Sequence, residues 1–261
     1  MLRHLRLYPI FVARRIQVLL EYRANFAIGV VSTLLMQGAG IAGVWVVLRR
    51  VGQVAGWRFE ELLLVYGLLV TARSIEHLFA DNLWTIGFHL REGTFDRFLV
   101  RPLDPLFHLL AERFNHDGVG TLLAGLLAVT AAWSGLAIPG TAANLACAAV
   151  AVLSGGVIFV ALNLVTATTA FFIVESLPVT RAVHDLNEFA KYPLSLYGRK
   201  VRALFTWVVP FGLASFYPAS FILGRDPGLV AWAAPAVAAA LSFLAYRFWR
   251  FGLAHHASTG S

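Results

Sequence analysis

The chain has 261 residues, of which 59% are hydrophobic and only 13% are charged, and its formal net charge is +7. Soluble domains carry about 25% charged residues, so this composition excludes an ordinary soluble protein and predicts an all-α integral membrane protein. The basic balance does not indicate nucleic acid as a partner, because the arginines cluster between apolar stretches, as the positive-inside rule describes. The single cysteine, Cys147, excludes an intrachain disulfide and a cysteine-based metal site.

The first 23 residues have the pattern of an amphipathic helix. Leucines including Leu2, Leu5 and Leu19 share one face, and Arg6 and Arg14 lie opposite. Because an apolar run follows directly, we expect this helix to lie in the membrane interface rather than to be a solvated helix packed on its own protein.

The first two predicted spans are residues 24–48 and 59–83. Each is long enough to cross roughly 30 Å of hydrocarbon. Within the first span, the small residues of GAGIAG (38–43) are suited to close helix contact.

Ionisable residues mark the second half of span 59–83, namely Arg73, Glu76, His77 and Asp81. Arg73 precedes Glu76 by three residues and His77 by four, so the three share a helix face and are able to pair. Groups at this depth normally face protein or water rather than lipid. The pattern fits a polar lining of a translocation path and, equally, a structural ion pair near the cytoplasmic end.

The segment 91–114 (REGTFDRFLVRPLDPLFHLLAERF) carries four arginines between spans that are almost uncharged. Gly93 is expected to break the preceding helix, and Thr94 to cap a new helix of about two turns with Asp96 in its first turn. Pro102 ends it. Phe95, Phe98 and Leu99 would then form an exposed apolar face, which persists only when docked against a partner.

The second half of the chain is less regular. Spans are predicted at 118–138, 142–174 and 229–250, and the 33 residues of the second are tilted, extended beyond the bilayer, or broken near residues 154–156. Residues 175–202 are only moderately apolar, and hydropathy leaves open a cytoplasmic amphipathic segment or a polar span. The next apolar run is cut by Pro210 and Pro218.

Charge orients these segments. With both termini in the cytoplasm, eleven arginines fall inside and four fall outside, so the 91–114 segment is predicted to be cytoplasmic. The adjacent His255 and His256 point to different sides of a helix, which favours a solvated tail over a metal site. No GxxxxGK[ST], HExxH or GxSxG motif occurs, so we expect no enzyme activity and no bound metal or cofactor.

The sequence resembles the type-2 ABC exporter permeases (ABC-2 type), in particular a group of uncharacterised bacterial permeases. The specific part of the likeness is REGTFDRFLVRPLDPLF, and EYRANF, YPLSLY and VVPFGLASFYPASFILG extend it over nearly the whole chain. The resemblance implies a single permease domain (24–261) with six spans. It places a fifth span at about 178–197 and makes residues 201–223, with Pro210 and Pro218, a re-entrant gate on the outer side.

The resemblance also implies partners and roles. Two ABC ATPase subunits would carry ATP and Mg, and a second permease chain would complete a homodimer or heterodimer in the bacterial inner membrane. The ATPase-coupling helix would hold Glu92, Gly93, Thr94, Phe95, Asp96, Arg97, Phe98 and Arg101. Candidates for the translocation path are Arg73, Glu76, His77, Asp185 and Glu188.

The implied function is export of a lipid-like, amphipathic or drug-like substrate from the cytoplasm. An alternative is a secondary transporter driven by an ion gradient, with Arg73, Glu76, His77 and Asp81 as its relay. No inverted repeat is visible in the chain to support that alternative.

Overall fold

The computed structural model describes residues 17, 21, 23–112, 115, 117–173 and 175–256. The predicted interfacial helix over residues 1–23 lies almost wholly outside them. Among the described residues the chain is helical, with one isolated β-bridge between Val54 and Trp57. This confirms the predicted all-α class.

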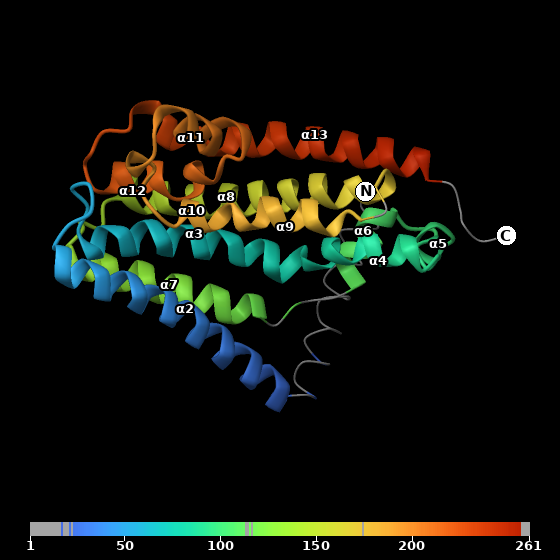
Figure 1. Ribbon diagram of the computed structural model, residues 1–261, viewed down its shortest axis with the longest axis horizontal. Coiled ribbons are helices and arrows are strands. Elements are labelled where there is room, and N and C mark those ends of the chain that lie inside the picture. The colour runs from blue at the N-terminus through green and yellow to red at the C-terminus, as the bar shows by residue number, and fades with distance from the viewer. Residues whose placement is uncertain are drawn as a thin grey trace.

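Helix α3 (Phe59–Phe79) is the centre of the bundle (Figure 1). It packs against α7 (Asp117–Gly135) on one side and α8 (Ala142–Thr168) on the other, and α13 (Ala234–His255) packs on α8. Small residues allow these close approaches, because two helix backbones meet where no side chain separates them.

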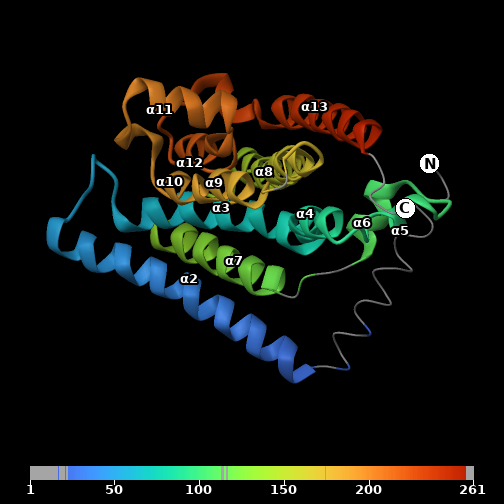
Figure 2. The same cartoon turned by 45° about the vertical axis from the view of Figure 1, so that its right-hand side comes forward.

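Helix α2 (Arg23–Val51) lies on the outside of the bundle against α7 and diverges from it toward its N-terminal end (Figure 2). None of its most apolar stretch is buried within the chain. A Cβ added at Gly38, Gly40 or Gly43 would meet no atom within 4 Å. The predicted close helix contact through GAGIAG is therefore wrong within a single chain.

Four helices are long and apolar enough to cross a membrane: α2, α3, α7 and α8 continued by η2 (Thr169–Phe171). A bent pair of shorter helices is a fifth candidate. These helices correspond to the first four predicted spans and make the chain a multi-pass membrane protein. α8 runs unbroken through Gly155 and Gly156, so of the three alternatives for this long span, a break near residues 154–156 is excluded.

Within residues 175–202, for which hydropathy left two structures open, the chain folds into short helices beside α3. They are α9 (Leu177–Asp185), α10 (Asn187–Ala190) and η3 (Leu194–Leu196). Neither this region nor α13, which follows η6 (Gly228–Trp232), is among the helices that meet the length and hydropathy of a span. The six-span arrangement therefore stays a prediction.

The bent pair occupies residues 199–222. Its first arm comprises α11 (Arg199–Ala203) and the π-helix η4 (Leu204–Val208), and its second comprises η5 (Phe211–Ala214) and α12 (Phe216–Ile222). The arms are bent by 74° around Pro210. Pro218 lies in the first turn of α12, where a proline removes no helical hydrogen bond.

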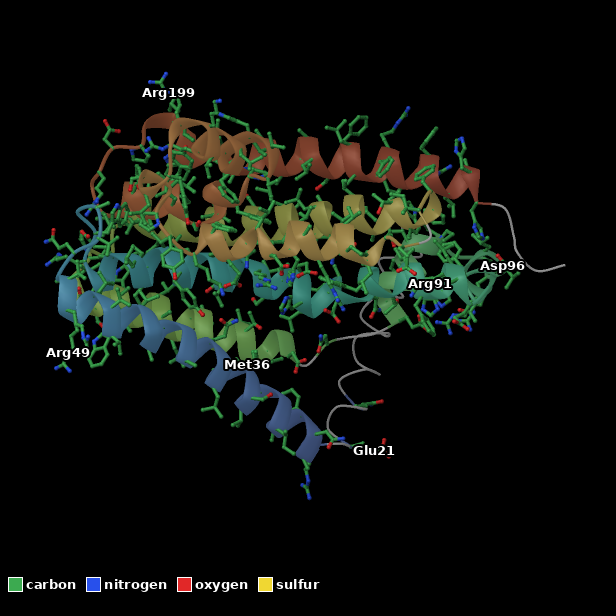
Figure 3. All side chains as sticks on the ribbon, in the orientation of Figure 1. Glu21, Met36, Arg49, Arg91, Asp96 and Arg199 are labelled. Carbon is green, nitrogen blue, oxygen red and sulfur yellow. The ribbon has the colours of Figure 1, made fainter. Side chains whose placement is uncertain are left out.

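The two ends of the bundle differ. One carries η1 (Asp81–Thr85), α4 (Ile86–Arg91), α5 (Asp96–Leu99) and α6 (Pro105–Glu112), with Arg91 and Asp96 in view in Figure 3. At the other end, Arg225 donates to Glu61 at 2.7 Å and lies over the Trp57 ring at 4.0 Å. Trp57 in turn donates to Ser195 Oγ of η3 at 2.9 Å, so these contacts join the loop before α3, the loop after α12 and η3.

Candidate functional site

The 91–114 segment is a folded projection at one end of the bundle. α4 ends at Arg91 and Gly93 has a φ of +65°, so the predicted helix break at this glycine is confirmed. The predicted cap is wrong, because Thr94 Oγ1 pairs with His89 Nδ1 at 2.9 Å and Phe95 occupies the N-cap position. α5 has four residues, about one turn rather than two.

The aromatic face of α5 points into the protein. Phe95 is 1% exposed and Phe98 is fully buried. The Phe95 ring lies 5.4 Å from Phe171 of η2 and 6.3 Å from Trp249 of α13, centroid to centroid. The prediction of an exposed aromatic face is therefore wrong: these rings anchor the segment to the ends of two long helices.

Polar side-chain contacts on the surface of the 91–114 segment also hold it in place. Arg97 donates to both carboxylate oxygens of Glu112, at 2.9 and 3.1 Å. His256 lies 3.3 Å from Asp96 Oδ1, and its ring packs at 5.3 Å from that of Phe95. The prediction of a solvated histidine tail is thus wrong for His256, which holds the projection to the end of α13.

Two histidines of this region have lowered pKa values. Burial is the larger cause for both, followed by the nearby guanidinium of Arg97 for His89 and of Arg101 for His108. Arg101 Nη1 lies 2.9 Å from His108 Nε2. Both imidazoles are therefore kept neutral at pH 7.

The exposed edge of the projection is mixed in character. Val100 is 81% exposed and Leu99 is 40% exposed, and no sequence signal distinguished Val100 as a contact residue. The other exposed residues from 91 to 102 are Arg91, Glu92, Gly93, Thr94, Arg97, Arg101 and Pro102. This edge offers an apolar centre with charges of both signs around it.

A second cluster lies inside the bundle. Glu76, 5% exposed, accepts a hydrogen bond at 2.5 Å from Asn163 of α8, and His77 Nε2 lies 3.5 Å from its other oxygen. The Arg73 guanidinium pairs with the His184 ring of α9. The predicted cluster of ionisable residues on α3 is thus present. Its polar partners, however, lie on α8 and α9, and residue spacing within α3 does not predict contacts with other helices.

The other predicted path residues lie around the edge of this cluster, near enough to interact electrostatically with Arg73, Glu76 and His184. Asp185 is exposed on α9, and Glu188 forms an ion pair at 2.7 Å with Lys191. Glu188 lines a cavity of about 90 Å³ between α2, α3 and α10. Asp81 accepts a hydrogen bond at 3.0 Å from Asn115.

These features define a helical, multi-pass membrane protein with a buttressed polar projection at one end and a polar cluster inside its bundle. Residues 34–260 match the family described as ABC-2 family transporter protein, and the chain belongs to this family. Its members are membrane subunits that partner an ABC ATPase. No curated protein and no solved structure matches the chain.

Proposed function

We propose that this chain is the permease subunit of an ATP-driven exporter that moves a lipid-like, amphipathic or drug-like substrate out of the cytoplasm. Two ATPase subunits bind ATP and Mg and dock on the 91–114 segment. The membrane is the bacterial inner membrane, and both termini lie on its cytoplasmic side. Family membership favours this function over a transporter driven by an ion gradient.

The observation that carries the proposal is the buttressing of the 91–114 segment. A helix of one turn has no stability of its own, yet α5 is held by buried Phe95 and Phe98 and by the Arg97 to Glu112 pair. Such anchoring transmits force, because a displacement of α5 is carried to η2 and α13. The residues that are exposed and available to contact the ATPase are Glu92 to Thr94, together with Leu99, Val100 and Arg101 at the exposed edge.

Exposed charges support a second permease chain. Asp185 and Glu188 are exposed along α9 and α10 at the depth of the buried part of α3. Ionisable groups at membrane depth face protein or water, not lipid. A homodimer or heterodimer with the path between its chains provides that environment.

The bent pair at 199–222 is proposed as the re-entrant gate. Backbone that leaves helical geometry is tolerated in a membrane only where protein or a water-filled path surrounds it. The 74° bend at Pro210 and the proline at the start of α12 give a segment of this kind, at the end of the bundle opposite the projection.

The docking proposal is tested by Val100→Asp. This change places a carboxylate at the apolar centre of the exposed edge without touching the buried anchors, and we expect co-purification of the ATPase to fall at least tenfold. Leu229→Asp is the matched control, since Leu229 is 89% exposed at the opposite end of the bundle. Equal recovery of the ATPase with both variants would overturn docking on this edge.

A further inference from the structure

A cavity of about 30 Å³ lies inside the bundle, between α3, α8, α9, α10 and η5. Its polar wall is formed by Arg73, Glu76, Asn163, Thr180, His184 and Asn187. A volume of this size accommodates one or two water-sized groups, such as the end of a larger molecule.

Two asparagines in this wall have unused hydrogen-bonding atoms. Asn187 is 1% exposed, and neither its Nδ2 nor its Oδ1 has a partner among the described residues. Asn163 uses its Nδ2 on Glu76, but its Oδ1 is likewise without one. Buried polar atoms are nearly always paired, so the cavity offers one free amide NH2 group as a donor and two free amide oxygens as acceptors to a ligand.

The charges of the wall select the kind of ligand. Arg73 and Glu76 place a guanidinium and a carboxyl group in the same wall, so the cavity is not lined by groups of one charge as a site for an anion or a cation would be. A hydroxyl both donates and accepts and bears no charge, which matches the free atoms of Asn187 and Asn163. Trp84, Phe159 and Phe211 complete the wall with apolar surface.

The cavity also adjoins the bent pair of helices. Phe211 directly follows Pro210, and its ring stacks on that of Phe159 with centroids 4.6 Å apart. Arg73, at the other side of the wall, lies six residues, about 9 Å, from the end of α3 nearest the projection. A group bound here thus contacts both the bent pair, at Phe211, and the half of α3 that leads to the projection.

We propose that this cavity binds the neutral, hydroxyl-bearing end of an amphipathic substrate, with Asn187 and Asn163 as the hydrogen-bonding residues. This inference rests on the proposed export function and names the chemical class of its substrate. The apolar remainder of the substrate lies outside the cavity, which is too small to hold it.

Binding is tested with the full chain in lipid nanodiscs, using monoolein as the probe and methyl oleate, which has no hydroxyl, as its match. The readout is tryptophan fluorescence, and Trp84→Phe identifies the part of the signal that arises at the cavity. We expect saturable binding of monoolein, at least tenfold weaker binding of methyl oleate, and at least tenfold weaker monoolein binding by Asn187→Leu. Equal binding of the two lipids, or unchanged monoolein binding by Asn187→Leu, would overturn the proposal.

A second measurement separates a binding role from a structural one. Without probe, Asn187→Leu removes two unpaired buried atoms at similar volume, so its melting temperature should equal or exceed that of the unaltered chain. Asn82→Leu is the matched control: Asn82 is also buried, at 5% exposed, but it donates to Leu109 O at 2.8 Å, so loss of this hydrogen bond lowers the melting temperature. A fall for Asn187→Leu as large as that for Asn82→Leu contradicts the proposal. ATPase co-purification is scored separately, so failure of docking and failure of this site are distinguishable.

Discussion

Gly125 sets how closely α7 approaches α3. A Cβ at this position would lie 2.6 Å from the backbone nitrogen of Thr71 and 2.9 Å from its Cα. Backbone atoms are unable to rotate away as a side chain does, so the helices themselves must separate to admit a larger residue.

We expect Gly125→Val to destabilise the chain by about 1–3 kcal/mol, the usual cost of overpacking, and more if α7 shifts. Gly38→Val is the matched control, because a Cβ at Gly38 meets no atom within 4 Å. Thermal unfolding of the purified chain in detergent measures both. A melting temperature for Gly125→Val equal to that of Gly38→Val would show that the helices do not meet here.

At the same scale, the sequence predicted one local feature correctly and another wrongly: the helix break at Gly93 is present, but Thr94 does not cap α5. The break at Gly93 was predictable because a glycine between a helical pattern and a new polar start is a local feature. The burial of Phe95 was not, because it depends on Phe171 and Trp249, which are distant in sequence. Spacing alone showed an apolar face but not whether the chain itself covers it.

At the scale of elements, the stability of the projection depends on the protonation of two histidines. His89 and His108 both have pKa values lowered by burial and by a neighbouring arginine. The unfolded segment, with histidine pKa values of about 6.5, therefore binds more protons in acid than the folded one. Their contribution to stability is fully present above about pH 6.5 and declines as the pH falls through that value.

We accordingly expect amide protection across residues 91–112 to be lower at pH 5.5 than at pH 7.5. Hydrogen exchange, corrected for the intrinsic rate at each pH, is the measurement. The double variant His89→Gln and His108→Gln should lose most of this pH dependence, since glutamine does not titrate. Undiminished dependence in the double variant would assign the effect to other groups.

The elements also differ in how far their sequences determine them. Continuous apolar runs of α2, α3, α7 and α8 indicated spans directly, because hydropathy and length are sufficient for that inference. Residues 175–202 mix charged and apolar residues, and their short helices α9 and α10 are arranged by packing on α8 and η5. No periodicity within that segment encodes those contacts.

At the scale of the whole molecule, the proposed orientation gives opposite exposure to the two ends of the bundle. Val100 directly follows α5, in the projection, and the exposed Gly140 lies in the turn between α7 and α8. α5 and the ends of α7 and α8 joined by this turn lie at opposite ends of the bundle (Figure 1). A membrane-impermeant maleimide should label Val100→Cys only in inside-out vesicles and Gly140→Cys only in intact cells.

The native Cys147 is 1% exposed, so the unaltered chain serves as the unlabelled control. Labelling of both introduced cysteines from the same side would contradict the proposed topology. Labelling with the two sides exchanged would reverse the orientation and remove the 91–114 segment from the reach of a cytoplasmic ATPase.

The anchoring of α5 to Trp249 makes α13 a lever. The helix has 22 residues and so measures about 33 Å, and its far end contributes Ala234 and Ala238 to the core that contains Phe205 and Phe211. Trp249 lies 15 residues, or about 22 Å, from Ala234, so if the helix moves as a rigid rod, a tilt of about 10° about Trp249 displaces that far end by about 4 Å. A small push on α5 is thereby enlarged where α13 meets the bent pair.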